Sequence, residues 1–299
     1  MNKFLILFLA STFLFSCEKP EENSAFLIVT TTGILGDGVK NFVPEGIEVI
    51  SLMGPGIDPH LYKPTSSDLS KLRKADLIVY NGIALEGKME EILENLSKKK
   101  PTIPISAFIS KEDLIQSEAF VGSYDPHIWF DVELWRKGLL GLRDSIYTVT
   151  NWKIEDSEPS DQNERLLKLD SGLKEKFLSI PEERRLLVTA HDAFSYFGRA
   201  YSIEVIGLQG ISTLSEAGLK DISNLVDFII DNEIKKVFVE TMVSEKGIDA
   251  VLEGCRLKGY EVEKGGTLYS DALGAEGTDQ DNYIGMVKYN SELILKALE

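Results

Sequence analysis

The sequence contains three histidines, and each lies in a short segment that also carries a carboxylate. His60 stands in GIDPHLYKPT, His127 in SYDPHIWFD and His191 in TAHDAF. Neutral imidazole is a favoured ligand of Zn²⁺ and of neighbouring transition-metal ions, and a carboxylate can complete such a set. A lone loop histidine is more often a surface residue, but three in similar settings favour a shared metal site.

Two carboxylates are candidates for the remaining ligand. Asp271 is the better candidate by its position in the second half of the chain, and Glu240 is the other. Glu240 could equally be a solvated acid or a partner that lies behind a ligand. The residues therefore favour three imidazoles with Asp271, and the role of Glu240 stays open.

Three further carboxylates stand beside the histidines in the sequence. Asp58 and Asp125 each precede a histidine by two residues, and Asp192 directly follows one. Such carboxylates can accept a hydrogen bond from the ring nitrogen that faces away from the metal, which fixes the tautomer. Helix capping and turn formation are equally good explanations for aspartates in these loops.

Strands that alternate with helices would hold these loops. In the first half, the patterns predict strands at 26–31, 47–52, 76–80 and 102–107 and helices at 33–43, 66–74, 86–97 and 131–149. In the second half, they predict strands at 185–189, 204–206, 236–239 and 260–263 and helices at 193–201, 219–232, 245–258 and 281–298. This alternation predicts parallel βαβ units and an α/β fold.

A polar, charge-rich segment separates the two halves. Residues 162–178 have the pattern of one amphipathic helix, which would bridge two lobes. Its apolar side is predicted to carry Leu166, Leu167, Leu169, Leu173 and Phe177. We therefore expect an N-terminal lobe at 25–150, a linker-helix region at 151–184 and a C-terminal lobe at 185–299, each lobe long enough to bury its own core.

The candidate ligands follow predicted strands. In open parallel sheets, ligands bind outside the carboxyl ends of the strands. The three histidines lie in loops after the second and fourth strands and just after the fifth, while Glu240 and Asp271 come at or after the ends of the last two. The sequence therefore brings every candidate to a sheet edge where a ligand is expected.

The first 24 residues are predicted to be a targeting segment rather than part of the fold. A single basic residue, Lys3, precedes a short apolar run, which is typical of a secretory signal peptide and too short for a membrane-spanning helix. The tetrapeptide LFSC, which ends at Cys17, resembles the lipobox of bacterial lipoproteins. We expect a signal peptide at 1–16, lipidation of Cys17 and a polar tether at 17–24. This places the protein in the cell envelope, lipid-anchored on the extracytoplasmic side of a bacterial membrane.

Composition excludes several classes of protein. The 299 residues carry a formal net charge of −16, which argues against a nucleic-acid binder or a polybasic membrane-surface protein. Two cysteines rule out a disulfide framework, and beside a lipidated Cys17 the second, Cys255, would be a small buried hydrophobe.

Five motifs together resemble one family, the zinc/manganese solute-binding lipoproteins of ABC importers, and its TroA-like branch most closely. They occur in order along nearly the whole mature chain: GIDPHLYKPTSSD, DPHIWFD, TAHDAFSYFGRAY, GLQGISTLSEAG and LYSDALGAEGTDQDNYIGMVKYN. The resemblance implies two lobes joined by one long helix, with the metal held in the cleft between them. It implies His60 and His127 as ligands from the first lobe and His191 and Asp271 from the second.

The resemblance also implies a cargo and partners. The cargo would be Zn²⁺, or alternatively Mn²⁺, handed to the permease of an ABC importer and its ATPase by a monomeric carrier. Manganese-type relatives often have Glu where this chain has His191, which leans towards zinc. The chain lacks the His- and acid-rich loop of many zinc-specific relatives, which weakens a strict zinc assignment.

Three other functions compete with this interpretation. A zinc-dependent hydrolase could use the same ligands with Glu240 as general base, but no HExxH motif occurs. A surface adhesin lipoprotein is a second alternative, although no adhesive element is visible. Nucleotide binding is the third alternative, suggested by the glycines of 33–38 after the first strand. These form GxxGxG rather than the GxGxxG of nucleotide-binding folds, so a structural role for them is favoured.

Overall fold

The computed structural model describes residues 25–117, 122–153 and 161–299. The expected signal peptide at 1–16, the lipidated Cys17 and the tether at 17–24 lie outside these residues. Within the described ranges, no helix combines the length and the apolar character needed to cross a membrane.

The first lobe is built on a four-stranded parallel sheet with the strand order β2-β1-β3-β4. Its strands are β1 (Leu27–Thr32), β2 (Glu48–Met53), β3 (Leu77–Tyr80) and β4 (Thr102–Pro104). Its helices are α1 (Gly33–Lys40), α2 (Ser66–Lys74), α3 (Glu90–Ser97) and α4 (Val132–Thr150). Parallel pairing of β1 with both β2 and β3 leaves the central strand fully buried at Ile28 and Val29.

The fourth strand is shorter than predicted. β4 ends at Pro104, and Ile105–Phe108 form a 3₁₀ helix where the sequence favoured a strand up to residue 107. Proline has no N–H to give to a strand ladder. The next hydrogen bond is instead made from the 3₁₀ helix, where Ser106 N donates at 3.2 Å to the carbonyl of Asn81, the residue after β3.

The second lobe contains two parallel strand pairs, β5–β6 and β7–β8, with β5 beside β7. The strands are β5 (Leu186–His191), β6 (Glu204–Gln209), β7 (Lys236–Glu240) and β8 (Glu263–Leu268). The helices are α6 (Ser195–Tyr201), α7 (Leu219–Asp231), α8 (Lys246–Leu257) and α9 (Tyr283–Leu298). The predicted α/β fold with parallel strands is confirmed.

The last strand was predicted at 260–263 and lies instead at Glu263–Leu268. Its sequence EKGGTL has no apolar β-branched run, so the pattern did not favour a strand there. A side chain at Gly265 would come within 2.7 Å of the ring of Phe238 on β7. Glycine thus leaves room for that ring, and the β7–β8 register shifts at Val237/Phe238.

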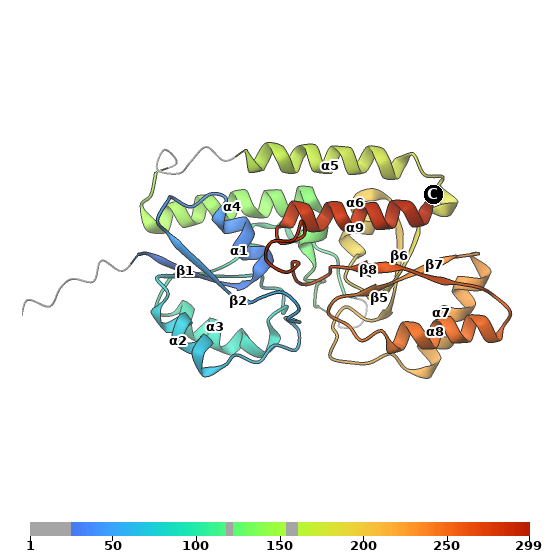
Figure 1. The fold of residues 1–299 in the computed structure, drawn as a ribbon. Helices are drawn as coiled ribbons and strands as arrows, with labels where there is room; N and C mark the ends of the chain where they lie inside the picture. The colour runs from blue at the N-terminus through green and yellow to red at the C-terminus, as the bar shows by residue number, and fades with distance from the viewer. Residues whose placement is uncertain (1–24, 118–121, 154–160) are drawn as a thin grey trace, which may run out of the picture.

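The linker helix α5 (Gln162–Leu178) has the predicted bounds and contacts α4 from the first lobe and α6 and α9 from the second. Figure 1 shows α5 lying along one side of the molecule above α4 and α9. Its buried stripe contains Leu166, Leu169, Leu173 and Phe177. Leu167 was predicted on the same side but is 43% exposed, because a rotation of about 100° per residue carries it off the stripe.

The largest apolar core is shared by the two lobes. Trp135 of α4 packs against Tyr283 of α9 with ring centroids 5.6 Å apart, and Phe177 of α5 contacts Phe197 of α6 at 5.3 Å. Each lobe also has a smaller apolar core of its own. The shared core joins the two lobes through α4, α5, α6 and α9.

Candidate metal centre

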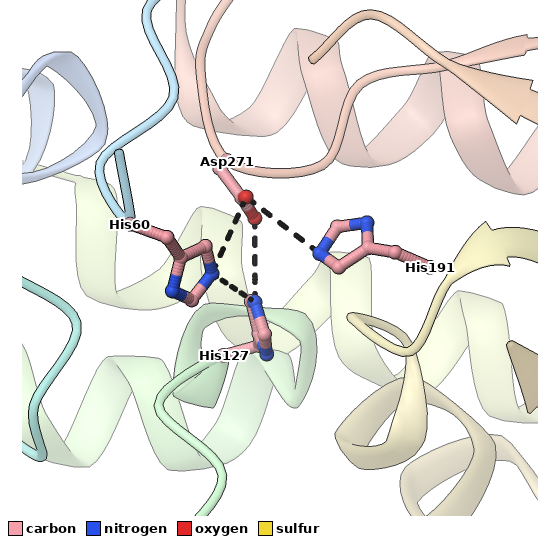
Figure 2. Close-up of side chains that lie close together, drawn as sticks. All are labelled: His60, His127, His191 and Asp271. Carbon is pink, nitrogen blue, oxygen red and sulfur yellow. Dashed lines mark hydrogen bonds and ion pairs between the residues drawn. The ribbon is translucent and has the colours of Figure 1, made fainter. Parts of the chain in front are cut away.

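Four predicted side chains converge between the lobes. His60, His127, His191 and Asp271 each offer a ligand atom, and these atoms all lie within 4.8 Å of one another. Figure 2 shows the three imidazoles pointing towards Asp271 from different parts of the chain. The Nε2 atoms of His60 and His127 are 3.2 Å apart, close enough to bind the same ion.

Asp271 lies at the centre of this cluster. Its carboxylate oxygens are 3.7 Å from His60 Nε2, 3.5 Å from His127 Nε2 and 3.7 Å from His191 Nε2. Both oxygens and His191 Nε2 are buried without a hydrogen-bond partner among the described residues. Buried polar atoms are normally satisfied, so their shared orientation fits a cation that all of them contact.

Strand ends position two of the three histidines, and a 3₁₀ helix positions the other. His60 follows β2, and its backbone N–H donates to Asp58 Oδ1 at 2.8 Å. His127 directly precedes a 3₁₀ helix, Ile128–Phe130, that leads into α4. His191 is the last residue of β5 itself, two residues beyond the predicted end of that strand.

The loop that carries Asp271 is held from two sides. On one side Asn290 of α9 pairs with Tyr269, which donates its N–H to Asn290 Oδ1 at 3.0 Å and accepts from Nδ2 at 2.6 Å. On the other side Trp129 Nε1 donates to Ser270 O at 3.0 Å. Asn290 was not predicted as a site residue, although a polar residue in the buried stripe of a helix is a usable signal.

Two of the flanking carboxylates contact the far nitrogen of a histidine ring. Asp125 Oδ1 lies 2.7 Å from His127 Nδ1 and also accepts the backbone N–H of His127 at 2.9 Å. Glu240 forms an ion pair with His191 Nδ1 and accepts the backbone N–H of His191 at 2.8 Å. In the neutral form of each ring this network assigns the proton to Nδ1, so Nε2 is the atom that can bind a metal ion.

The other two flanking carboxylates act elsewhere. Asp58 fixes the backbone of His60, as described above, and Asp192 accepts a hydrogen bond from Ser195 Oγ at 2.7 Å at the start of α6. Among the described residues, neither shows a contact with an imidazole nitrogen. Asp58 thus has the turn role that was the alternative for it, whereas Asp192 bonds to the Ser195 hydroxyl without capping the backbone of α6.

Burial and neighbouring charges keep two of the imidazoles neutral. Burial, with the nearby histidines, lowers the pKa of His60 to about 3, and burial lowers the pKa of His127 well below its usual range. Neutral rings can bind a metal without first losing a proton.

The pKa values of His191 and Asp271 are raised instead. Burial alone would lower the pKa of His191, but the carboxylates of Glu240 and Asp271 raise it to about 9. Burial raises the pKa of Asp271 to about 7. His191 therefore carries a proton at neutral pH that an arriving cation would displace.

Aromatic side chains surround the site. The indole of Trp129 packs edge-on against His127 with ring centroids 5.3 Å apart, and Tyr196 donates its hydroxyl hydrogen to Asp125 O at 2.9 Å. Three of the four candidate ligands are no more than 2% exposed, and His60 is 5% exposed. A cation held here would be nearly dehydrated, and the protein atoms would supply its coordination shell.

The family of zinc-uptake complex component A, periplasmic, matches this chain over residues 28–297. The chain is 42% identical to the manganese-binding lipoprotein MntA of Bacillus subtilis over 284 residues, which cover 91% of this chain and 89% of MntA. It is 40% identical to the zinc-binding protein TroA of Treponema pallidum over 274 residues, covering 91% and 88% of the two chains.

The fold shows the same likeness. The solved structure of the periplasmic zinc-binding protein TroA from Treponema pallidum superposes with a TM-score of 0.87 and covers 92% of this chain and 99% of its own. The two-lobe arrangement described above is therefore shared with a protein of known structure.

Proposed function

This chain belongs to the family of periplasmic zinc-uptake components, and we propose that it captures a divalent transition-metal ion outside the cytoplasm and delivers it to an ABC-type importer. The observation that carries the proposal is the buried group of three imidazoles around one carboxylate whose oxygens have no partner among the described residues. The names of the similar proteins, metal-binding lipoproteins and zinc-binding proteins, support the same function.

We propose four ligands, two from each lobe. His60 and His127 come from the lobe at 25–150, and His191 and Asp271 come from the lobe at 185–299, with 151–184 as the linker region. In this proposal Asp125 and Glu240 orient the two innermost rings. A complete shell then requires both lobes, so metal binding is coupled to how the loops of the lobes meet.

The cargo we propose is Zn²⁺ or Mn²⁺. Similar proteins are named for each metal, MntA for manganese and TroA for zinc. Three imidazoles and one carboxylate give zinc the higher intrinsic affinity, since affinity rises along the Irving–Williams order from manganese to zinc. The metal loaded in the cell then depends on availability as well as on the ligands.

We propose that the carrier is a monomer, held at the membrane by a lipid on Cys17 and unloaded by a permease with its ATPase. Relatives named as substrate-binding lipoproteins of manganese ABC transporters support the importer as partner. The lipid would keep the carrier close to the membrane in which that permease lies.

The geometry gives less support to a hydrolase. A zinc hydrolase needs a general base free to activate water, and Glu240 is already paired with His191. The matching family is named as a zinc-uptake component, and similar proteins are named as substrate-binding lipoproteins of manganese ABC transporters.

A titration tests the proposed function. Protein stripped with a chelator should bind one Zn²⁺ per chain in isothermal titration calorimetry, and Mn²⁺ should compete for the same site. Failure of the wild-type protein to bind either ion would overturn the proposal.

A further inference from the structure

Two loops, one from each lobe, meet at a single hydrogen bond near the candidate metal site. The loop at 54–65 follows β2 and carries His60, and the loop at 210–218 follows β6. Thr213 Oγ1 of the second loop donates to Asp58 Oδ2 of the first at 2.7 Å. In Figure 1 both loops lie on the side of the lobes away from α5.

The carboxylate of Asp58 accepts hydrogen bonds from both lobes. One oxygen accepts the hydrogen bond from Thr213, and the other accepts the backbone N–H groups of His60 at 2.8 Å and of Leu61 at 3.4 Å. A shift of Thr213 would therefore act on Asp58, and through Asp58 on the backbone that positions His60.

Several other hydrogen bonds between the lobes involve other segments. Among them, Trp129 Nε1 donates to Ser270 O, Tyr196 donates to Asp125 O, and the backbone N–H of Tyr283 donates to Asp37 Oδ2 at 3.0 Å. Within the described ranges, Thr213 makes the only hydrogen bond from the second lobe to the loop at 54–65. Apart from the approach of His60 itself to Asp271, one hydroxyl group thus ties the loop of His60 to the opposite lobe by hydrogen bonding.

This loop also lies closest to solvent. His60 is the most exposed of the four proposed ligands at 5%, while His127 and His191 are fully buried. Asp58 and Thr213 are half-buried, and the neighbouring Ile57 and Leu214 are exposed. Among the proposed ligands, His60 therefore lies nearest to solvent, in the loop that the Thr213–Asp58 hydrogen bond holds.

We propose that Thr213 is a positioning residue that sets how long the metal ion is retained. It touches no ligand atom and acts through Asp58, which holds the loop of His60 against the second lobe. The inference rests on the proposed function, because it concerns release from that same site. Breaking the hydrogen bond should speed dissociation and leave association unchanged, since an ion can reach the three inner ligands before the loop closes.

The test compares Thr213→Val with Thr213→Ser in full-length protein loaded with Zn²⁺. Stopped-flow mixing with a chromogenic zinc chelator measures the dissociation rate, and mixing of metal-free protein with Zn²⁺ measures the association rate. Loss of a hydrogen bond to a carboxylate should accelerate dissociation about tenfold in Thr213→Val, whereas Thr213→Ser keeps the hydroxyl and the slow rate.

Thr148→Val is the matched control, because it removes the same hydroxyl from an exposed threonine of α4 that bonds only within its own helix to Asp144 O. Unchanged dissociation in Thr213→Val would overturn the inference while leaving the metal site intact. Equal acceleration in Thr213→Ser, or slower association, would also overturn it, because either result points to a general packing defect. A wild-type protein that takes up no zinc would instead refute the proposed function.

Discussion

Substitution of Glu240 by Gln tests whether the ring of His191 is protonated and charged before metal binds. In the wild-type protein the carboxylates of Glu240 and Asp271 raise the pKa of His191 to about 9, so its ring is charged at neutral pH. A metal ion needs a neutral ring, so binding must expel this proton. Affinity should therefore fall as the pH drops below about 9, by roughly tenfold per pH unit.

The magnitude is best measured at pH 8. Asp271 has a pKa of about 7 and is largely ionised there, whereas His191, with a pKa of about 9, is roughly nine-tenths protonated. Wild-type protein should release about one proton per zinc ion bound, roughly nine-tenths of it from His191. Glu240→Gln keeps a hydrogen-bond acceptor but removes the charge, so burial lowers the pKa of His191 and release at pH 8 should approach zero.

Calorimetric titrations in buffers of different ionisation enthalpy count these protons. Asp192→Asn is the control, since Asp192 also lies beside His191 in sequence but bonds to Ser195, and its release should match wild type. If Glu240→Gln still released nearly one proton at pH 8, the assignment of the proton to the His191–Glu240 pair would be wrong.

Three further predictions concern a ligand, a residue that holds the loop of Asp271, and the stability of the fold. His127→Ala should weaken zinc binding by more than the roughly 10- to 100-fold that loss of an outer partner costs, as measured by competition with a chelator of known affinity. Asn290→Leu should free the loop of Asp271 and lower zinc affinity about tenfold, while the unfolding free energy of metal-free protein drops by about 1–3 kcal/mol in urea titrations. Zinc at 100 times its dissociation constant should stabilise the fold by about 2.7 kcal/mol, and a chelator should return the melting temperature to that of metal-free protein. Equal melting temperatures with and without zinc would contradict a site that exists only in the folded chain.

The sequence predicted the main features of the site because they depend on local pattern and on a general rule of α/β folds. His60, His127 and Asp271 lie in loops that follow strands, and such loops meet at one edge of a parallel sheet. The bounds of the linker helix at 162–178 also followed from its amphipathic period and matched the structure.

The features that were missed depend on contacts between distant segments. β8 was misplaced because its strand character comes from pairing with β7 and from the ring of Phe238 over Gly265, which no local pattern records. The partners Asn290 and Thr213 are ordinary polar residues in sequence, and only the fold brings them to the loops that carry Asp271 and His60.

The shared helical core has a practical consequence for biosensor design. Because α4, α5, α6 and α9 pack into one apolar cluster that includes residues of both lobes, the lobes have little freedom to swing apart. A pair of fluorophores placed one on each lobe would hardly change its energy transfer when an ion is bound. A single environment-sensitive dye at exposed Leu214, beside the loop contact, would give the larger optical signal.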